Sequence, residues 1–240
     1  MRAGCCSCIG HAFCEERRLN KRLARERDLT MHRLIAAAFL SVMAAAPAGA
    51  ATCPGNITYH DTFASAGPGW NTATAASVKV TMAGGKADIS FTQPGIGQSL
   101  TYSTIQYGDV SLCATVSAPA TAKAENEAAG VIFWGTSPSA YYMFEVTTDG
   151  QFFVGSNNGT AWTALFARQT NAAVAKGVGV NNTLQVTTKG NLATFYVNGT
   201  QVATLTGVPP AGGGTVGIYA ESSTTSPEAM DISDFQIAVP

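Results

Sequence analysis

Apolar and polar residues alternate in short runs through most of the chain. The clearest case spans 182–220, where NTLQVTTKGNLATFYVNGTQVATL is followed by a Pro/Gly connection and then GTVGIYA. Two tight turns, Lys189-Gly190 and Asn198-Gly199, separate runs rich in Val, Thr, Leu, Phe and Tyr. Asn-Gly between alternating runs indicates a β-hairpin, because both turn residues must accept positive φ. The pattern predicts a β-meander.

The same alternation predicts strands on both sides of this meander. The expected strands cover 57–63, 77–82, 86–91, 99–102, 109–116, 130–134, 141–147, 151–155, 161–167 and 230–239. Residues 118–127 form a polar connection with room for one helical turn, and the Ala/Gly-rich segment 168–180 is expected to be a loop. Short strands without a long helix or an internal repeat predict an all-β fold, a two-sheet antiparallel jelly-roll sandwich.

The N-terminal fifth of the chain differs from this pattern. Residues 31–50, MHRLIAAAFLSVMAAAPAGA, combine a short basic start, an apolar run and the small residues Ala48-Gly49-Ala50. They predict a secretory signal peptide cleaved near Ala50, since the apolar run is too short to span a membrane. The protein is then exported, to the periplasm or outside the cell, as one domain over 51–240 with no membrane span.

Residues 1–30 contain four cysteines and an Arg/Glu-rich run. The favoured interpretation is a misassigned start, with synthesis beginning at Met31, or a disordered extension. A metal-binding or helical regulatory tail is the alternative, although the cysteine spacing lacks the second pair of a zinc finger.

The charge and cysteine content of 51–240 narrow the choice of partners. This region has six Lys and Arg against eleven Asp and Glu, a formal net charge of −5, and no basic cluster. Binding to nucleic acid or to an anionic membrane surface is therefore not expected. Its two cysteines, Cys53 and Cys113, favour one disulfide in an exported chain. A lipid anchor on Cys53 is the alternative, but the residues before it fit that signal poorly.

Several short motifs follow one another along the chain. They are Asp61, Phe63 and Trp70 near the start; AGVIFW, then Tyr141-Tyr142, Asp149-Gly150 and Trp162; FYVNG followed by GTVGIYA; and DISDFQI at the end. Over 57–239 this order resembles the concanavalin A-like lectin/glucanase superfamily, in particular its bacterial laminin-G-like and keto-disaccharide hydrolase-like domains. The resemblance implies a sandwich whose last strand pairs beside the first. It implies less about function, since that superfamily includes sugar-binding modules, hydrolases and adhesive domains.

Catalytic signals are weak. The retaining glucanases of the superfamily carry a Glu-x-Asp-x-x-Glu strand, and this sequence has none. Glu125 and Glu127 have a two-residue spacing but lie in the polar connection, where we expect solvated side chains. His60 is the only histidine after residue 50, so neither a three-histidine zinc site nor a supported Ser-His-Asp set is available.

No cofactor is expected apart from a possible structural ion. Asp61 on the first strand and Asp231 or Asp234 on the last could meet if those strands pair. Carboxylate oxygens suit calcium. The alternative is that these aspartates are simply solvated.

Sugar binding requires aromatic faces beside polar side chains. Along 141–147, alternation places Tyr142, Phe144 and Val146 in the core and Tyr141, Met143 and Glu145 on the other face. Tyr196 and Tyr219 point outward on their own strands, and Glu221 follows. If these strands share a sheet, the candidates for a sugar-binding groove are Tyr141, Glu145, Tyr196, Tyr219 and Glu221, with Trp134 and Trp162 as further candidates. The alternative is that the aromatic residues pack under loops or cover a second sheet face.

The leading interpretation is an exported, non-catalytic sandwich that binds a carbohydrate or a cell-envelope glycan. One alternative is a glycoside hydrolase-like enzyme acting on a modified disaccharide, with Glu145 or Glu221 as the acid. Another is an adhesive or structural envelope protein without a small ligand. The missing carboxylate pair favours binding over hydrolysis.

Overall fold

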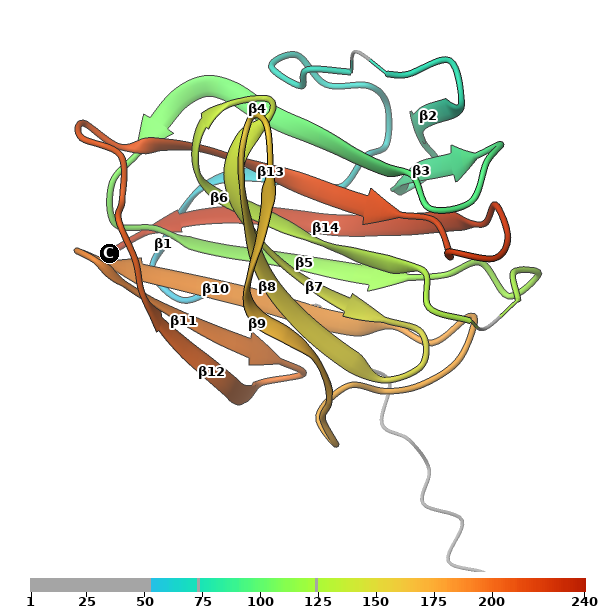
Figure 1. Cartoon of the computed structure of the whole chain (residues 1–240). Helices are drawn as coiled ribbons and strands as arrows, with labels where there is room; N and C mark the ends of the chain where they lie inside the picture. The colour runs from blue at the N-terminus through green and yellow to red at the C-terminus, as the bar shows by residue number, and fades with distance from the viewer. Residues whose placement is uncertain (1–52, 73, 124) are drawn as a thin grey trace, which may run out of the picture. The chain divides into compact units, whose positions relative to one another are not determined.

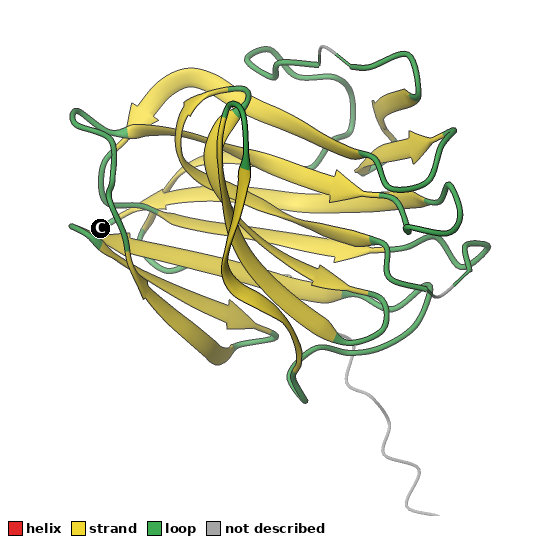
Figure 2. Cartoon of the chain, viewed as in Figure 1, coloured by secondary structure: helices red, strands yellow, loops and turns green. Residues whose placement is uncertain are grey.

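The computed structural model describes residues 53–72, 74–123 and 125–240. This part of the chain forms fourteen β-strands and contains no helix (Figure 2). No helix long and apolar enough to cross a membrane occurs among these residues. The expected signal peptide and the cysteine-rich segment before it lie outside the described residues.

The strands form two antiparallel sheets that lie face to face (Figure 1). The six-stranded sheet has the order β4 (Gly97–Tyr107), β13 (Gly214–Glu221), β6 (Ala128–Ser137), β7 (Ala140–Thr147), β8 (Gln151–Asn158) and β9 (Trp162–Thr170). The eight-stranded sheet has the order β12 (Thr200–Thr206), β11 (Leu192–Val197), β10 (Asn182–Lys189), β5 (Ser111–Ser117), β14 (Ala229–Val239), β3 (Lys86–Phe91) and β2 (Val78–Ala83), and β1 (Asn56–Asp61) also pairs with β14. The all-β jelly-roll sandwich expected from the sequence is confirmed.

Aromatic side chains fill the space between the sheets. Phe133 and Phe144 reach inward from β6 and β7, and Phe195 reaches inward from β11. The ring of Phe195 lies 5.6 Å from that of Phe133 and 5.0 Å from that of Phe144, measured between centroids. All three side chains are fully buried. Burying each one contributes about 1.5–3 kcal/mol, so this contact holds the two layers together.

The expected hairpins and the pairing of the chain ends are confirmed. Asn198 and Gly199 have φ values of 50° and 78°, the left-handed conformation that the turn between β11 and β12 requires. Strand β1 pairs with β14 from Asn56 opposite Val239 to Asp61 opposite Phe235. The closing strand therefore lies beside the first, as the resemblance implied.

Two connections differ from expectation. Strand β9 continues through Arg168 to Thr170, so the start of the expected loop 168–180 is wrong. Because β9 is an edge strand with long exposed stretches, it lacks the apolar alternation that marks the other strands. In the polar connection, Glu127 is fully buried rather than solvated. It directly precedes β6 and accepts a hydrogen bond from the Glu125 N–H at 3.1 Å.

The expected disulfide is present. Cys53 and Cys113 are bonded, and Cys113 lies in β5 beside β14. The backbone N–H of Cys53 also donates to Gln236 Oε1 at 3.2 Å. The bond fastens the segment before β1 to a central strand of the eight-stranded sheet.

Reducing this disulfide should lower the free energy of unfolding by about 4 kcal/mol, because it closes a loop with a sequence separation of 60 residues. Urea denaturation with and without dithiothreitol measures the change. The control is the double variant Cys53→Ser, Cys113→Ser. Dithiothreitol should not change the urea concentration at which this variant is half unfolded. A wild-type midpoint insensitive to the reductant would contradict this stabilising role.

Candidate functional site

The six-stranded sheet is buried on its outer face as well as its inner one. Ile132, Tyr141, Met143 and Tyr219 form a small apolar cluster with Phe153, separate from the main core. We call this outer surface of β6, β7, β8, β9 and β13 the site face. Alternate residues of each strand form this outer cluster, because the residues between them point into the sandwich.

The middle strand of the site face carries small residues. Gly130 on β6 lies between Glu145 on β7 and Tyr219 on β13, and Ala128 lies opposite Glu221. A Cβ atom on Gly130 would lie 2.0 Å from the carbonyl oxygen of Phe144, which no side chain tolerates. The lack of bulk on β6 leaves room for longer side chains from the neighbouring strands.

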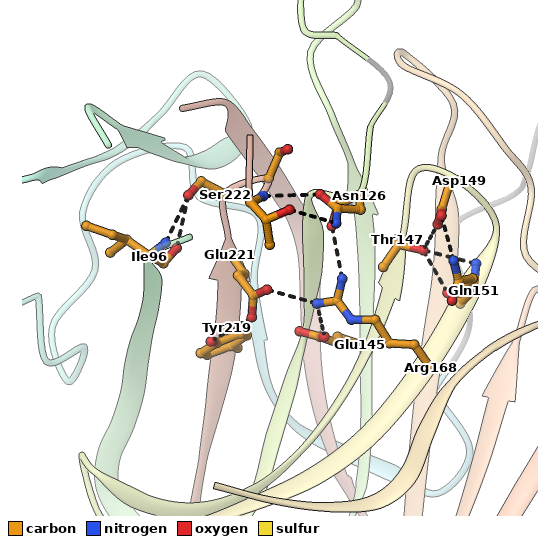
Figure 3. Close-up of polar contacts among 12 residues, drawn as sticks. Ile96, Asn126, Glu145, Thr147, Asp149, Gln151, Arg168, Tyr219, Glu221 and Ser222 are labelled. Carbon is orange, nitrogen blue, oxygen red and sulfur yellow. Dashed lines mark hydrogen bonds and ion pairs between the residues drawn. The ribbon is translucent and has the colours of Figure 1, made fainter. Parts of the chain in front are cut away.

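Arg168 uses that room. From β9 its guanidinium NH2 group donates to Glu145 Oε1 at 3.0 Å and to Glu221 Oε1 at 2.9 Å. Its NH1 group donates to the backbone oxygen of Asn126 at 3.1 Å. Figure 3 shows the guanidinium between the two carboxylates, with Tyr219 beneath Glu221. One cation thus joins three elements that are distant in sequence.

The two carboxylates of this cluster have different environments. The Glu145 side chain is 1% exposed and that of Glu221 is 23% exposed. Burial raises the pKa of Glu145 from 4.5 to about 8, and the Glu221 carboxylate adds to the increase. Arg168 acts in the opposite direction but does not offset burial. Glu145 Oε2 is buried and has no hydrogen-bond partner in the described structure.

Three aromatic rings stand beside the cluster. The centroids of Tyr141, Trp162 and Tyr219 lie 5.8 to 6.4 Å from one another. Burial, together with the nearby Glu145 and Glu221 carboxylates, raises the pKa of Tyr219 well above its usual value. Its hydroxyl therefore stays protonated and donates to Glu221 Oε2 at 3.3 Å. Trp162 remains 46% exposed, an unusual position for so large an apolar side chain.

Two pockets open on the site face and share Trp162 and Tyr219. The aromatic pocket has a volume of about 260 Å³ and is also lined by Tyr141, Ser99, Ser139 and Asn157. The carboxylate pocket has a volume of about 160 Å³ and is also lined by Glu145, Arg168, Glu221, Met143 and Phe153. Aromatic and polar side chains therefore line both pockets together.

Five of the seven sugar-binding candidates from the sequence come together here: Tyr141, Glu145, Trp162, Tyr219 and Glu221. Tyr196 does not, because β11 belongs to the eight-stranded sheet. The condition that these strands share one sheet is therefore not met for Tyr196 and Tyr219. The segment between β12 and β13 crosses from one sheet to the other, so the expected meander is divided between them.

Trp134 is also away from the site face. It is 3% exposed and packs against Phe133 and Tyr142 in the main core, at centroid distances of 5.2 and 5.3 Å. Its φ of 48° lies within the irregular register of β6, so the regular alternation stops there. Trp134 lines a third pocket of about 470 Å³, beside Val208 and Pro209, which shares Tyr141 and Asn157 with the aromatic pocket.

The sequence argument missed Arg168, which lies at the centre of the site. It stands where alternation is weakest, at the end of an edge strand. One signal was available, since Arg168 is the only arginine in 51–240, a region with an excess of acidic residues. A single arginine in such a region is a candidate partner for a buried carboxylate.

The aspartates proposed for calcium each have another partner. Asp61 accepts hydrogen bonds from Trp70 Nε1 and from the Tyr59 hydroxyl, both at 2.8 Å. Asp231 pairs with Lys86 at 2.8 Å, and Asp234 pairs with His60 at 2.6 Å. Within the described part of the chain, no three His, Cys, Asp or Glu side chains are grouped so as to hold a metal ion.

The sequence matches no protein-family model and no curated protein. Solved structures are nevertheless similar in fold. The Emp47p carbohydrate recognition domain has 15% identity and a TM-score of 0.55, over 77% of this chain and 98% of that one. A Bacillus licheniformis beta-glucanase has 12% identity and a TM-score of 0.55, over 78% and 100%.

A Bacillus subtilis protein of unknown function with a galectin-like fold has 10% identity and a TM-score of 0.55, over 77% of this chain and 96% of that one. The three structures share the concanavalin A-like jelly roll with this chain. The resemblance seen in the sequence is thus confirmed for the fold.

The buried carboxyl gives stability a specific dependence on pH. The pKa of the Glu145 carboxyl is 4.5 in the unfolded chain and about 8 in the folded protein. Between these two pH values the folded state therefore binds one proton that the unfolded state has lost. Stability from this group is fully present below about pH 4.5 and is lost as the pH rises towards about 8. The difference in unfolding free energy, wild type minus Glu145→Gln, should fall across this range by at most about 1.4 kcal/mol per pH unit.

Urea denaturation of both proteins at a series of pH values measures this difference. The subtraction removes the contribution of every other titrating group that the substitution leaves unchanged. A difference that stays flat or grows with pH would mean that Glu145 is ionised in the folded protein.

Proposed function

We propose that the protein is an exported, non-catalytic carbohydrate-binding domain, and that a sugar or cell-envelope glycan binds on the site face. The observation that carries the proposal is the adjacency of the Tyr141, Trp162 and Tyr219 rings to the Glu145–Arg168–Glu221 cluster. A pyranose ring has an apolar face that stacks on an aromatic ring and hydroxyl groups that form hydrogen bonds. The site face offers both kinds of contact side by side.

Each side of the site would make a different contribution. Trp162 is exposed next to both pockets, so covering it with the face of a sugar removes apolar surface from water. Glu145 Oε2 has no hydrogen-bond partner among the described residues and can bond a hydroxyl group of the ligand. Stacking supplies affinity, while the buried polar group selects ligands that can pair with it.

The structural neighbours support this class of ligand. One is a carbohydrate recognition domain and another is a beta-glucanase, and both share the sandwich over more than three quarters of this chain. A sandwich of this kind therefore supports carbohydrate binding with or without hydrolysis. The contacts of the site favour binding alone.

Hydrolysis is the competing function, and the raised pKa of Glu145 favours it as an acid. In a retaining glycosidase the scissile bond lies between two carboxylates about 5–5.5 Å apart. Here the space between Glu145 and Glu221 is occupied by the guanidinium of Arg168, which bonds to both. A sugar would have to displace a partly buried, doubly paired cation before either carboxylate could act, and this supports a non-catalytic role.

Export is supported by two independent features. Residues 31–50 have the pattern of a signal peptide. The folded domain also contains the Cys53–Cys113 disulfide, a bond that persists in oxidising compartments.

Removing the exposed ring of Trp162, or the buried ring of Tyr219 that packs against it, should weaken glycan binding. Tyr219→Ala and Trp162→Ala are each expected to raise the dissociation constant about tenfold to a hundredfold for a glycan identified on an array. Tyr196→Ala is the matched control, because Tyr196 lies on the other sheet. Unchanged binding in both site variants, with circular dichroism like the wild type, would remove the site face from the proposal.

The same glycans should remain intact. We expect no release of reducing sugar by the wild-type protein over a day with any glycan that it binds. Release that Glu145→Gln or Glu221→Gln abolishes would establish hydrolysis instead. An absence of both binding and release across the array would favour an adhesive or structural protein.

A further inference from the structure

The carboxylate pocket contains more negative than positive groups. Glu145 and Glu221 share a single cation, Arg168. None of the lysines in the described part of the chain lines this pocket. With both carboxylates ionised, the pocket therefore has one negative charge in excess. Such an excess at a partly desolvated site favours a ligand that brings a positive charge.

The hydrogen-bonding groups show the same imbalance. The NH2 group of Arg168 donates one bond to each carboxylate, which uses both of its hydrogens. The Tyr219 hydroxyl donates to Glu221 Oε2. Glu145 Oε2 is left buried without a partner, so the group that still lacks a bond in the ionised cluster is an acceptor. A ligand group rich in hydrogen-bond donors would satisfy it.

The walls of the pocket suit a cation as well. Trp162, Tyr219 and Phe153 all line the same cavity of about 160 Å³ as the two carboxylates. The face of an aromatic ring attracts a cation within about 6 Å, and tryptophan does so most strongly. An ammonium group in this pocket would meet carboxylate oxygens on one side and ring faces on another.

On the basis of the proposed function, we propose that the carboxylate pocket recognises the free ammonium group of an amino sugar in its unacetylated form. The neighbouring aromatic pocket, which shares Trp162 and Tyr219, holds the ring of the sugar. An N-acetyl group in place of the ammonium removes the charge and two of its donors. A neutral ligand of this kind cannot stabilise the Glu145 carboxylate, so Glu145 keeps its proton and no ion pair forms with the ligand.

Recognition of a cation here is linked to a proton. The titratable groups that face Glu145 are Glu221 and Tyr219 on β13, Arg168 on β9 and Tyr141 on β7. In the empty site the pKa of Glu145 is about 8, so its carboxyl is neutral at about pH 6. A bound ammonium group stabilises the carboxylate, and the proton passes from Glu145 to the buffer. A neutral sugar gives no such release.

Isothermal titration calorimetry on a matched panel of oligosaccharides tests this inference. Each backbone is offered in three forms, with a free amine, an N-acetyl group or a hydroxyl at the same carbon. Titrations at about pH 6, in two buffers with different heats of ionisation, count the protons released. We expect the amine form to bind at least about tenfold more tightly than its partners and to release up to one proton per ligand.

Substitutions then assign the effect to the pocket. Glu221→Gln removes a negative charge, and Glu145→Gln removes the charge that Glu145 would acquire when the ammonium group binds. Each should reduce the ratio of amine to N-acetyl affinity by about tenfold. Glu228→Gln removes the same charge outside the pocket and should leave the ratio unchanged. Glu221 is partly exposed, so we expect Glu221→Gln to fold like the wild type. Its affinity ratio can then be measured even if the substitution of the buried Glu145 impairs folding.

The outcomes separate this inference from the proposed function. Binding of a neutral form with equal or greater affinity than its amine form overturns amine recognition and leaves carbohydrate binding in place. Amine preference that survives in both pocket variants also overturns it, because the preference then lies elsewhere. Failure of every member of the panel to bind counts against both.

Discussion

The packing of one sheet against the other determines where every functional side chain points. Phe144 must lie in the core against Phe195, and the two-residue period of a strand then places Glu145 on the outer face. Side chains from the neighbouring strands surround that position, so the Glu145 carboxyl group is buried. A buried carboxyl needs either a proton or a cation. Arg168 and the raised pKa of Glu145 are the two responses that the fold provides.

Small residues on β6 connect this constraint to the shape of the site. Gly130 and Ala128 occupy the positions between the carboxylates, where larger side chains would fill the space that the guanidinium needs. The shape of the site face therefore depends as much on the small side chains of the central strand as on the charged groups around it. Tyr219 and Trp162 line both pockets, so they stand where the two pockets adjoin.

Local alternation predicted which face each residue of β7 occupies, and it did so correctly for Tyr141, Phe144 and Glu145. It could not predict which sheet a strand joins, because that choice depends on partners far away in sequence. Tyr196 illustrates the limit: its strand is two-faced as expected but lies in the other layer. Arg168 illustrates a second limit of prediction from alternation. It lies on an edge strand, which needs no apolar alternation to be stable, so the pattern does not reveal it.

The disulfide also determines how a mechanical load would pass through the domain. Cys53 precedes β1 and is bonded to Cys113 in β5, while the last strand, β14, runs beside both β1 and β5. A pull on the two ends of the domain would enter β5 through the covalent bond and leave through β14, without loading β1. Because Cys113 lies opposite Gln236, the load would pass from β5 to β14 close to the C-terminal end of β14. The six-stranded sheet, with its pockets, lies outside that path.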